Sequence, residues 1–249
     1  MVCAEFGHPA LAPHVKGISV LNAVLALLCA VFGIMGCVSY SNSEKAISTA
    51  PYTAMVLKNK SDKSTAAYYF GLRAYVIFSK VGDADGEYGE INTFKDCLAE
   101  QDTYCEANPT QCQPESTNYC KKCNKAGTAV VSMCSLALIA AFVAFLAHLL
   151  RATCDSTFSK DISFLGGITA FVFGVIAFSV YRPCHSSIKL ASDIFVQMGA
   201  EINFGTGAKL VAASFGMILI ISLFSLSIPV AVAGTQAQAV PTSEATTKV

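Results

Sequence analysis

Six of the eleven cysteines in this chain could do chemistry, because a thiol can close a disulfide, bind a metal or take part in redox exchange. Five of them lie between two long apolar stretches, and the sixth follows a third stretch. Their even number favours three disulfides in an oxidising compartment. Because the first group is odd, we expect Cys184 to tie the two loops together. The six are Cys97, Cys105, Cys112, Cys120, Cys123 and Cys184.

Two other interpretations of these cysteines compete with structural disulfides. The segment 120–123 has the C-x-x-C spacing of thiol oxidoreductases, in which flanking lysines favour the reactive thiolate. If the loop faced the cytosol, four thiolates could instead hold zinc, from Cys105, Cys112, Cys120 and Cys123. Cys-x-x-Cys arises readily in any Cys-rich loop, however, and no quinone-pocket signature accompanies it. We therefore favour structural disulfides and predict no catalytic residue, no cofactor and no metal.

Four long stretches without charged residues must position these cysteines, and each is long enough for the roughly 20 residues that a spanning helix needs. Backbone groups in lipid must be paired internally, so each stretch is predicted to be a helix. The first apolar run exceeds a signal-peptide core, which favours an uncleaved anchor. The predicted order is an N-terminal tail 1–16, span 17–39, Cys-rich loop domain 40–125, span 126–150, short cytosolic loop 151–161, span 162–181, second loop 182–209, span 210–232 and disordered tail 233–249.

Composition supports this fold class and limits the functions. Apolar residues make up 53% of the chain and charged residues 14%, and the net charge of zero gives no reason to expect nucleic acid as a partner. No Asp, Glu, Lys or Arg lies inside a predicted span, which argues against an ion-coupled transporter. His148, near a span end beside Arg151, is predicted to be an interfacial anchor. The bilayer and other membrane proteins are the expected partners.

Small residues recur at helical spacing in two spans. Such stripes let helices approach closely, and packing within the chain is the default interpretation, with a homo-oligomer as the alternative. The residues are Ala26 and Ala30 in the first span, and Gly166, Ala170 and Gly174 in the third. Ser222, Ser225 and Ser227 in the fourth span could line a small pore or bond helix to helix.

Two sequence signals disagree on which side of the membrane the Cys-rich loop faces. Lysines and arginines near the membrane ends favour a cytosolic loop, but long loops translocate largely regardless of charge. The cysteines favour an extracellular or lumenal loop. Asn59-Lys60-Ser61 is a glycosylation acceptor on that side. We therefore predict a multi-pass protein of the plasma membrane or an endomembrane, with this loop outside.

Within the loops, residues 67–78 are aromatic and β-branched and predict one or two strands. Residues 82–86 predict a turn. Residues 92–123 are polar and Cys-dense, which favours a stapled, loop-rich segment. Residues 187–202 have apolar residues at helical spacing and predict a short amphipathic helix. The tail ends in Thr247-Lys248-Val249, a pattern typical of ligands for PDZ-type domains.

The order of a long outer loop, a short inner loop and a medium outer loop resembles the claudin and peripheral-myelin-protein superfamily of four-span proteins. Phe70-Gly71-Leu72-Arg73 resembles that family's Gly-Leu-Trp element, and the downstream cysteines and terminal Val also fit. The chain departs from the family in having no Trp, a longer loop and more cysteines than one pair. The expected fold is an all-α membrane protein, a four-helix transmembrane bundle with a small disulfide-rich, partly β domain between its first two helices.

The predicted function is structural, as a protein of lateral assembly, adhesion or an accessory subunit of a membrane complex. The alternatives are a membrane thiol-disulfide oxidoreductase that uses Cys120 and Cys123, and a small channel or pore subunit.

Overall fold

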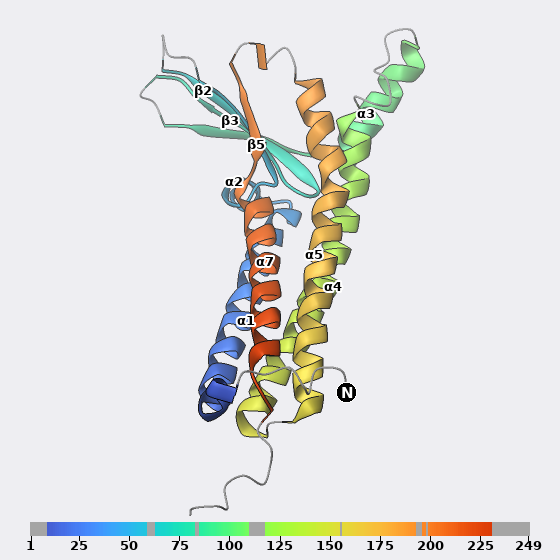
Figure 1. Ribbon diagram of the computed structural model, residues 1–249. Helices are drawn as coiled ribbons and strands as arrows, with labels where there is room; N and C mark the ends of the chain where they lie inside the picture. The colour runs from blue at the N-terminus through green and yellow to red at the C-terminus, as the bar shows by residue number, and fades with distance from the viewer. Residues whose placement is uncertain are drawn as a thin grey trace, which may run out of the picture.

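Four long helices stand side by side, with an antiparallel sheet at one end (Figure 1). The computed structural model describes residues 9–58, 63–82, 85–109, 118–154, 156–192, 196–197 and 199–230. Among these, four helices are long and apolar enough to cross a membrane, which makes the chain a multi-pass membrane protein. They are α1 (Val15–Cys37), α4 (Tyr119–Thr153), α5 (Thr157–Ala191) and α7 (Thr206–Ser227).

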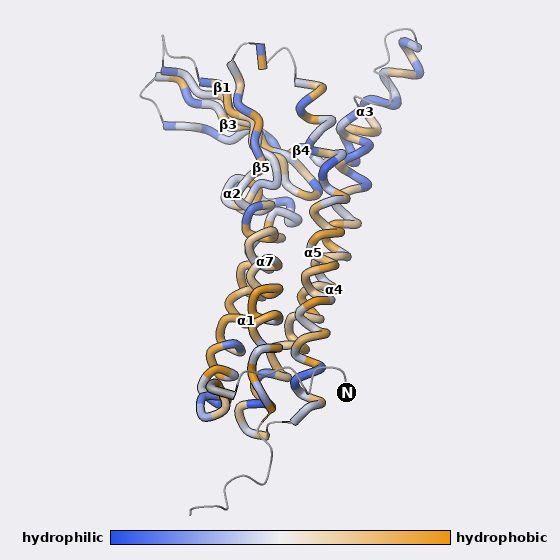
Figure 2. The backbone as a smooth tube through the Cα atoms, viewed as in Figure 1, coloured by the Kyte–Doolittle hydropathy of each residue, from blue (hydrophilic) through white to orange (hydrophobic). Residues whose placement is uncertain are grey.

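Each long helix contacts two others. α4 packs against α1 and α5, and α7 packs against the same two helices. Small side chains such as Ala23, Ala137 and Ala170 face inward and are fully buried. Large apolar side chains such as Ile139 and Ile220 point outward, as they do where lipid surrounds a helix, and the middle of the helices is accordingly hydrophobic (Figure 2).

The helix ends differ from the predicted spans. α4 begins at Tyr119 and α5 continues to Ala191, so both extend beyond the membrane-crossing stretch beside the sheet (Figure 1). Within the predicted loop 151–161, α4 continues to Thr153 and α5 already begins at Thr157, where Ser156 and Ser159 form a capping box. α7 ends at Ser227 rather than 232, since Pro229 has no N–H with which to continue it.

The sheet has the order β4-β3-β2-β1-β5. Residues 67–78 contribute to two strands, as predicted. The predicted amphipathic helix over 187–202 is wrong, because its first part extends α5 and its end forms β5, which pairs with β1. The strands are β1 (Thr53–Lys58), β2 (Thr65–Phe70), β3 (Ala74–Lys80), β4 (Glu87–Thr93) and β5 (Glu201–Phe204).

Short helices complete the part of the chain that the structure describes. The expectation of a loop-rich segment over 92–123 is wrong, because α3 (Phe94–Ala107) forms there, and the Thr93 side chain caps it by accepting from the Asp96 N–H at 3.1 Å. The others are η1 (Pro9–His14), η2 (Val38–Tyr40) and α2 (Glu44–Thr49).

A buried polar cluster closes the bundle at the end opposite the sheet. His148 is 1% exposed, so the prediction of an interfacial anchor is wrong. The Arg151 guanidinium is fully buried and donates to the Ser225 hydroxyl at 3.1 Å and the Pro229 carbonyl at 3.4 Å. It thereby satisfies the Pro229 carbonyl group, which lies beyond the end of α7. The Ser225 hydroxyl also lies 3.1 Å from the Ser163 hydroxyl, so Ser225 of α7 is bonded to both α4 and α5.

Candidate functional site

The candidate site is the junction between the sheet and the bundle. Two disulfides lie in this junction at the start of α4, where Cys120 and Cys123 are about one helical turn apart. Cys120 bonds Cys97 of α3, with the Cα atoms 5.9 Å apart, and Cys123 bonds Cys184 of α5, with the Cα atoms 4.7 Å apart. The second bridge joins the two loops, as expected of Cys184. Cys105 is also disulfide-bonded.

This pairing bears on both alternative interpretations of the cysteines. Cys120 and Cys123 bond different partners, so they do not form the bridge that a C-x-x-C redox motif requires. Together with Cys105 they are engaged in disulfides, so three of the four cysteines proposed as zinc ligands are not free thiolates in this structure. Among the described residues no group of three or more potential ligands could hold a metal ion. In this structure the two bonds cross-link α4 to α3 and to α5.

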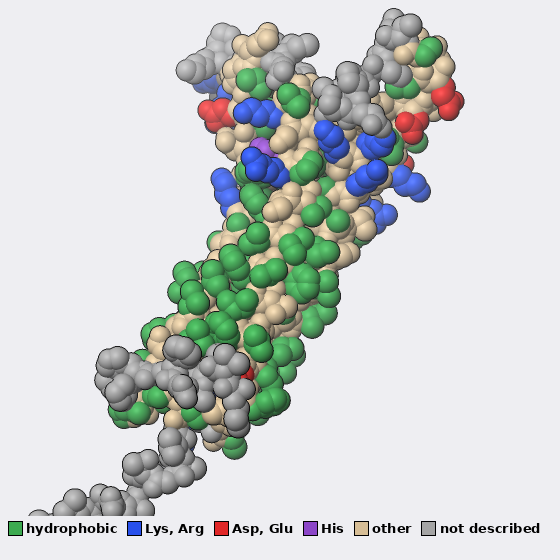
Figure 3. Space-filling view, turned by 45° about the vertical axis from the view of Figure 1, so that its right-hand side comes forward, with side chains coloured by type: hydrophobic (Ala, Val, Ile, Leu, Met, Phe, Trp, Pro, Cys, Tyr) green, Lys and Arg blue, Asp and Glu red, His purple; other side chains and the backbone are tan. Residues whose placement is uncertain are grey.

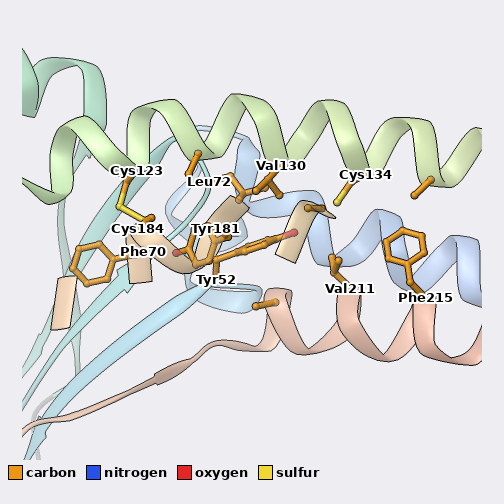
Figure 4. Packing of buried hydrophobic residues seen from close by; sticks show 14 of the residues in the cluster. Tyr52, Phe70, Leu72, Cys123, Val130, Cys134, Tyr181, Cys184, Val211 and Phe215 are labelled. Carbon is orange, nitrogen blue, oxygen red and sulfur yellow. A yellow bond between two sulfur atoms is a disulfide. The ribbon is translucent and has the colours of Figure 1, made fainter. Parts of the chain in front are cut away.

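A polar contact fixes the first strand to α5. The Thr53 hydroxyl lies 3.0 Å from the Tyr181 hydroxyl and 3.0 Å from His185 Nδ1. Tyr52 and Tyr181 meet edge to face with ring centres 4.9 Å apart, and both are 1% exposed (Figure 4). Burial raises the pKa of the Tyr52 phenol, which stays neutral. The start of β1 is thus held in the core of the bundle.

The turn between β2 and β3 inserts between helices. Leu72 is buried, and its N–H donates to the Ser39 carbonyl at 3.3 Å. At Gly127 of α4 a side chain would overlap the Leu72 carbonyl, so only glycine allows this approach. The Arg73 guanidinium lies over the Tyr40 ring, 5.9 Å from its centre. The element that resembles Gly-Leu-Trp therefore forms the wedge that seats the sheet on the bundle.

Aromatic side chains line a hollow of about 260 Å³ between the sheet and the ends of α4 and α5. Phe70 is its centre, with ring centres 5.6 Å from Tyr75 and 6.3 Å from Tyr119. Burial raises the pKa of Tyr75, so this phenol is neutral and can donate a hydrogen bond. Such a surface suits contact with apolar or aromatic groups.

The two outer strands of the sheet have unpaired edges in the described structure. β4 is exposed at its first four residues, including Glu87, Tyr88 and Glu90. β5, at the other edge, is only four residues long. An edge strand presents unpaired N–H and C=O groups, which can pair with another chain unless charge or shape prevents it.

The predicted packing residues lie at contacts within the chain. Ala26 and Ala170 are fully buried, while Ala30 is partly buried. Gly166 faces Ala140 and Ala144 of α4, and Gly174 faces Phe215 of α7. Sequence reasoning did not predict close packing at Gly127 and Gly207, which it noted only as glycines that precede a span, nor at Gly167 and Gly205. Asn59, Cys112, Thr247 and Val249 lie outside the described residues.

The sequence matches no protein-family model and no curated protein. The geometry of the junction is therefore the basis for a functional proposal.

Proposed function

We propose that this chain is a structural membrane protein, similar in role to claudins and peripheral myelin proteins, whose sheet makes lateral contacts with other membrane proteins, including further copies of itself. The role involves no catalysis. The sheet end of the bundle faces the extracellular space or an organelle lumen. Glycosylation at Asn59 and binding of a PDZ-type partner through Thr247 and Val249 remain predictions from the sequence.

The disulfides support the proposed orientation. Cys97–Cys120 and Cys123–Cys184 both lie at the sheet end, while the exposed free thiol of Cys154 lies at the opposite end, between α4 and α5. Disulfides persist in oxidising compartments and free thiols in reducing ones. This segregation outweighs the number of basic residues at the sheet end, since long loops translocate regardless of charge.

The observation that carries the role is that both loops form one sheet with a fixed position on the bundle. β5 from the second loop pairs with β1 from the first, and Cys123–Cys184 bonds the helices that flank them. A rigid domain holds its edges at a constant height above the membrane, which lateral association between neighbours requires. The exposed β4 edge, which carries Glu87 and Glu90, is the edge that the sheet offers for such contacts.

Cysteine cross-linking in proteoliposomes tests this role. A Glu90→Cys variant in a Cys154→Ser background places one thiol on the β4 edge, and Lys125→Cys in the same background places an exposed thiol on α4 as the control. With a short bis-maleimide, we expect a covalent dimer from Glu90→Cys and little from Lys125→Cys. In native membranes, an adduct with a different protein would identify a heterologous partner. Equal cross-linking of the two variants, or none in either membrane, would contradict the proposal.

A further inference from the structure

One face of α5 changes from apolar to basic at the sheet end of the bundle. Six side chains follow one another at alternating intervals of four and three residues, which places them in a single row along the helix. The first three belong to the membrane-crossing stretch and the last three follow it. They are Phe171, Val175, Phe178, Arg182, His185 and Lys189.

The apolar half of this row forms one wall of a slot between α5 and α7. The slot has a volume of about 170 Å³, with Phe171, Val175 and Phe178 on one side and Phe215 and Gly216 on the other. Empty apolar cavities of roughly 150 Å³ hold a molecule as large as benzene. The slot therefore has room for a segment of an acyl chain, the apolar group that surrounds this helix in a membrane.

The basic half of the row lines a hollow of about 470 Å³ next to β5. Arg182 and Lys189 are exposed, and no acidic residue is among the described side chains that line this hollow. His185 is fixed by its contact with Thr53 and stacks on Phe204, with ring centres 3.9 Å apart. Lysine and arginine side chains also gather around the sheet end of the bundle, above the apolar surface (Figure 3).

The slot and the hollow are neighbours. Phe178 lines the slot and Phe204 lines the hollow, and their ring centres lie 5.0 Å apart. From Val175 to His185 the helix rises by about 15 Å, at about 1.5 Å per residue. An anionic headgroup and the middle of its acyl chain are separated by a similar length. Basic pockets between membrane helices bind lipid headgroups on the cytoplasmic and matrix sides of membranes, and phospholipids of the other leaflet carry the same phosphate.

We propose that this face binds one phospholipid from the leaflet at the sheet end of the bundle. Its phosphate accepts charge-assisted hydrogen bonds from Arg182 and Lys189, and one acyl chain lies in the slot against Phe178 and Gly216. A phospholipid satisfies both halves at once, whereas a free phosphate lacks the chain and a diacylglycerol lacks the anion. The site is made of different residues from the β4 edge to which the proposed function assigns lateral contacts, and lipid retention is measured separately from those contacts.

Native mass spectrometry of the detergent-purified full chain tests the headgroup half. The probes are a phosphatidylglycerol, the diacylglycerol with the same chains, and inorganic phosphate. We expect one bound phosphatidylglycerol per chain and no retention of the other two. The double variant Arg182→Gln with Lys189→Gln should raise the apparent Kd by about tenfold or more. The control, Lys95→Gln with Lys125→Gln, removes the same charge from exposed positions at the same end and should leave the Kd unchanged.

The slot is tested by Gly216→Leu. A Cβ at Gly216 would meet nothing within 4 Å and Gly216 lines the slot, so a larger side chain there occupies space that the acyl chain would take. We expect it to lose the lipid, while Gly17→Leu, equally open on α1, retains it. Equal loss in both charge variants would reduce the site to unspecific attraction and overturn the proposal. Retention of diacylglycerol, or retention of phosphatidylglycerol by Gly216→Leu, would overturn it as well.

Discussion

Replacing Gly127 with alanine tests how the sheet is seated on the bundle. Gly127 lies in α4 opposite the Leu72 carbonyl, and a Cβ there would overlap that oxygen. In an exposed helix the same substitution stabilises, because glycine is about 1 kcal/mol less favourable than alanine. At Gly127 the two effects oppose each other, so the sign of the change shows whether the wedge is packed as described.

The magnitude follows from the nature of the obstruction. One inserted carbon in a packed core costs about 1–3 kcal/mol, and the upper end applies here because the obstructing atom is a backbone oxygen rather than a flexible side chain. After the gain in helix propensity, Gly127→Ala should lower the stability by about 2 kcal/mol. For a chain of this size that corresponds to a fall in Tm of about 4–8 °C.

The assay uses thiols that the fold conceals. Cys29 and Cys134 are free and each 1% exposed, so a maleimide dye reacts with them only on unfolding, while exposed Cys154 and partly buried Cys37 set the baseline among the described residues. Gly216→Ala is the matched control, and its Tm should rise because nothing lies within 4 Å of its new carbon. If Gly127→Ala were as stable as Gly216→Ala, the insertion of Leu72 between the helices would be refuted.

Three further substitutions test other contacts by the same measurement. Replacing both Cys123 and Cys184 with serine opens a loop of 61 residues. Chain entropy predicts a loss of up to about 4 kcal/mol in the free energy of unfolding, and a smaller loss if α4 and α5 stay packed in the unfolded state. An unchanged Tm would show that the bridge does not stabilise the fold. Ser225→Ala removes an acceptor from buried Arg151 and should cost about 2 kcal/mol, whereas Ser227→Ala on the exposed side should cost nothing, and equal values would contradict the assigned contact. Thr93→Ala removes the α3 cap at a cost of about 1 kcal/mol and should speed proteolysis within α3 alone.

The sequence was sufficient to predict the four long helices, because apolar runs of that length have few other structures available to them. It was insufficient for the helix ends at the sheet. α4 and α5 continue beyond their uncharged stretches, where Cys123–Cys184 and the buried Ile188 hold them together. The helical spacing of apolar residues over 187–202 correctly indicated a helix in its first part, but that part is the end of α5 and not a separate helix. Tertiary cross-links therefore decided boundaries that local pattern could not.

The sheet was predictable only where its strands are strongly apolar. The aromatic segment 67–78 predicted β2 and β3. The sequence did not predict β5, because it is a four-residue strand of mixed polarity. Its partner β1 is about 150 residues away in the chain, and it forms because β1 offers a free edge. The odd number of cysteines in the first loop predicted that Cys184 bonds one of them. That its partner is Cys123 depends on the packing of α4 against α5, which the sequence pattern does not show.

Phe204 shows how the two proposed surfaces are connected through one strand. It ends β5, stacks on His185 of α5 and packs on Phe178 at the mouth of the slot. Gly205 follows Phe204 directly, and a Cβ at this position would overlap the Pro51 carbonyl oxygen. The next residue, Thr206, begins α7. A lipid held against Phe204 therefore contacts the strand that anchors one edge of the sheet, while β4 lies at the other edge. If the sheet is rigid, loss of that lipid should alter the seating of the whole sheet and not β5 alone, so Gly216→Leu should also change cross-linking at Glu90.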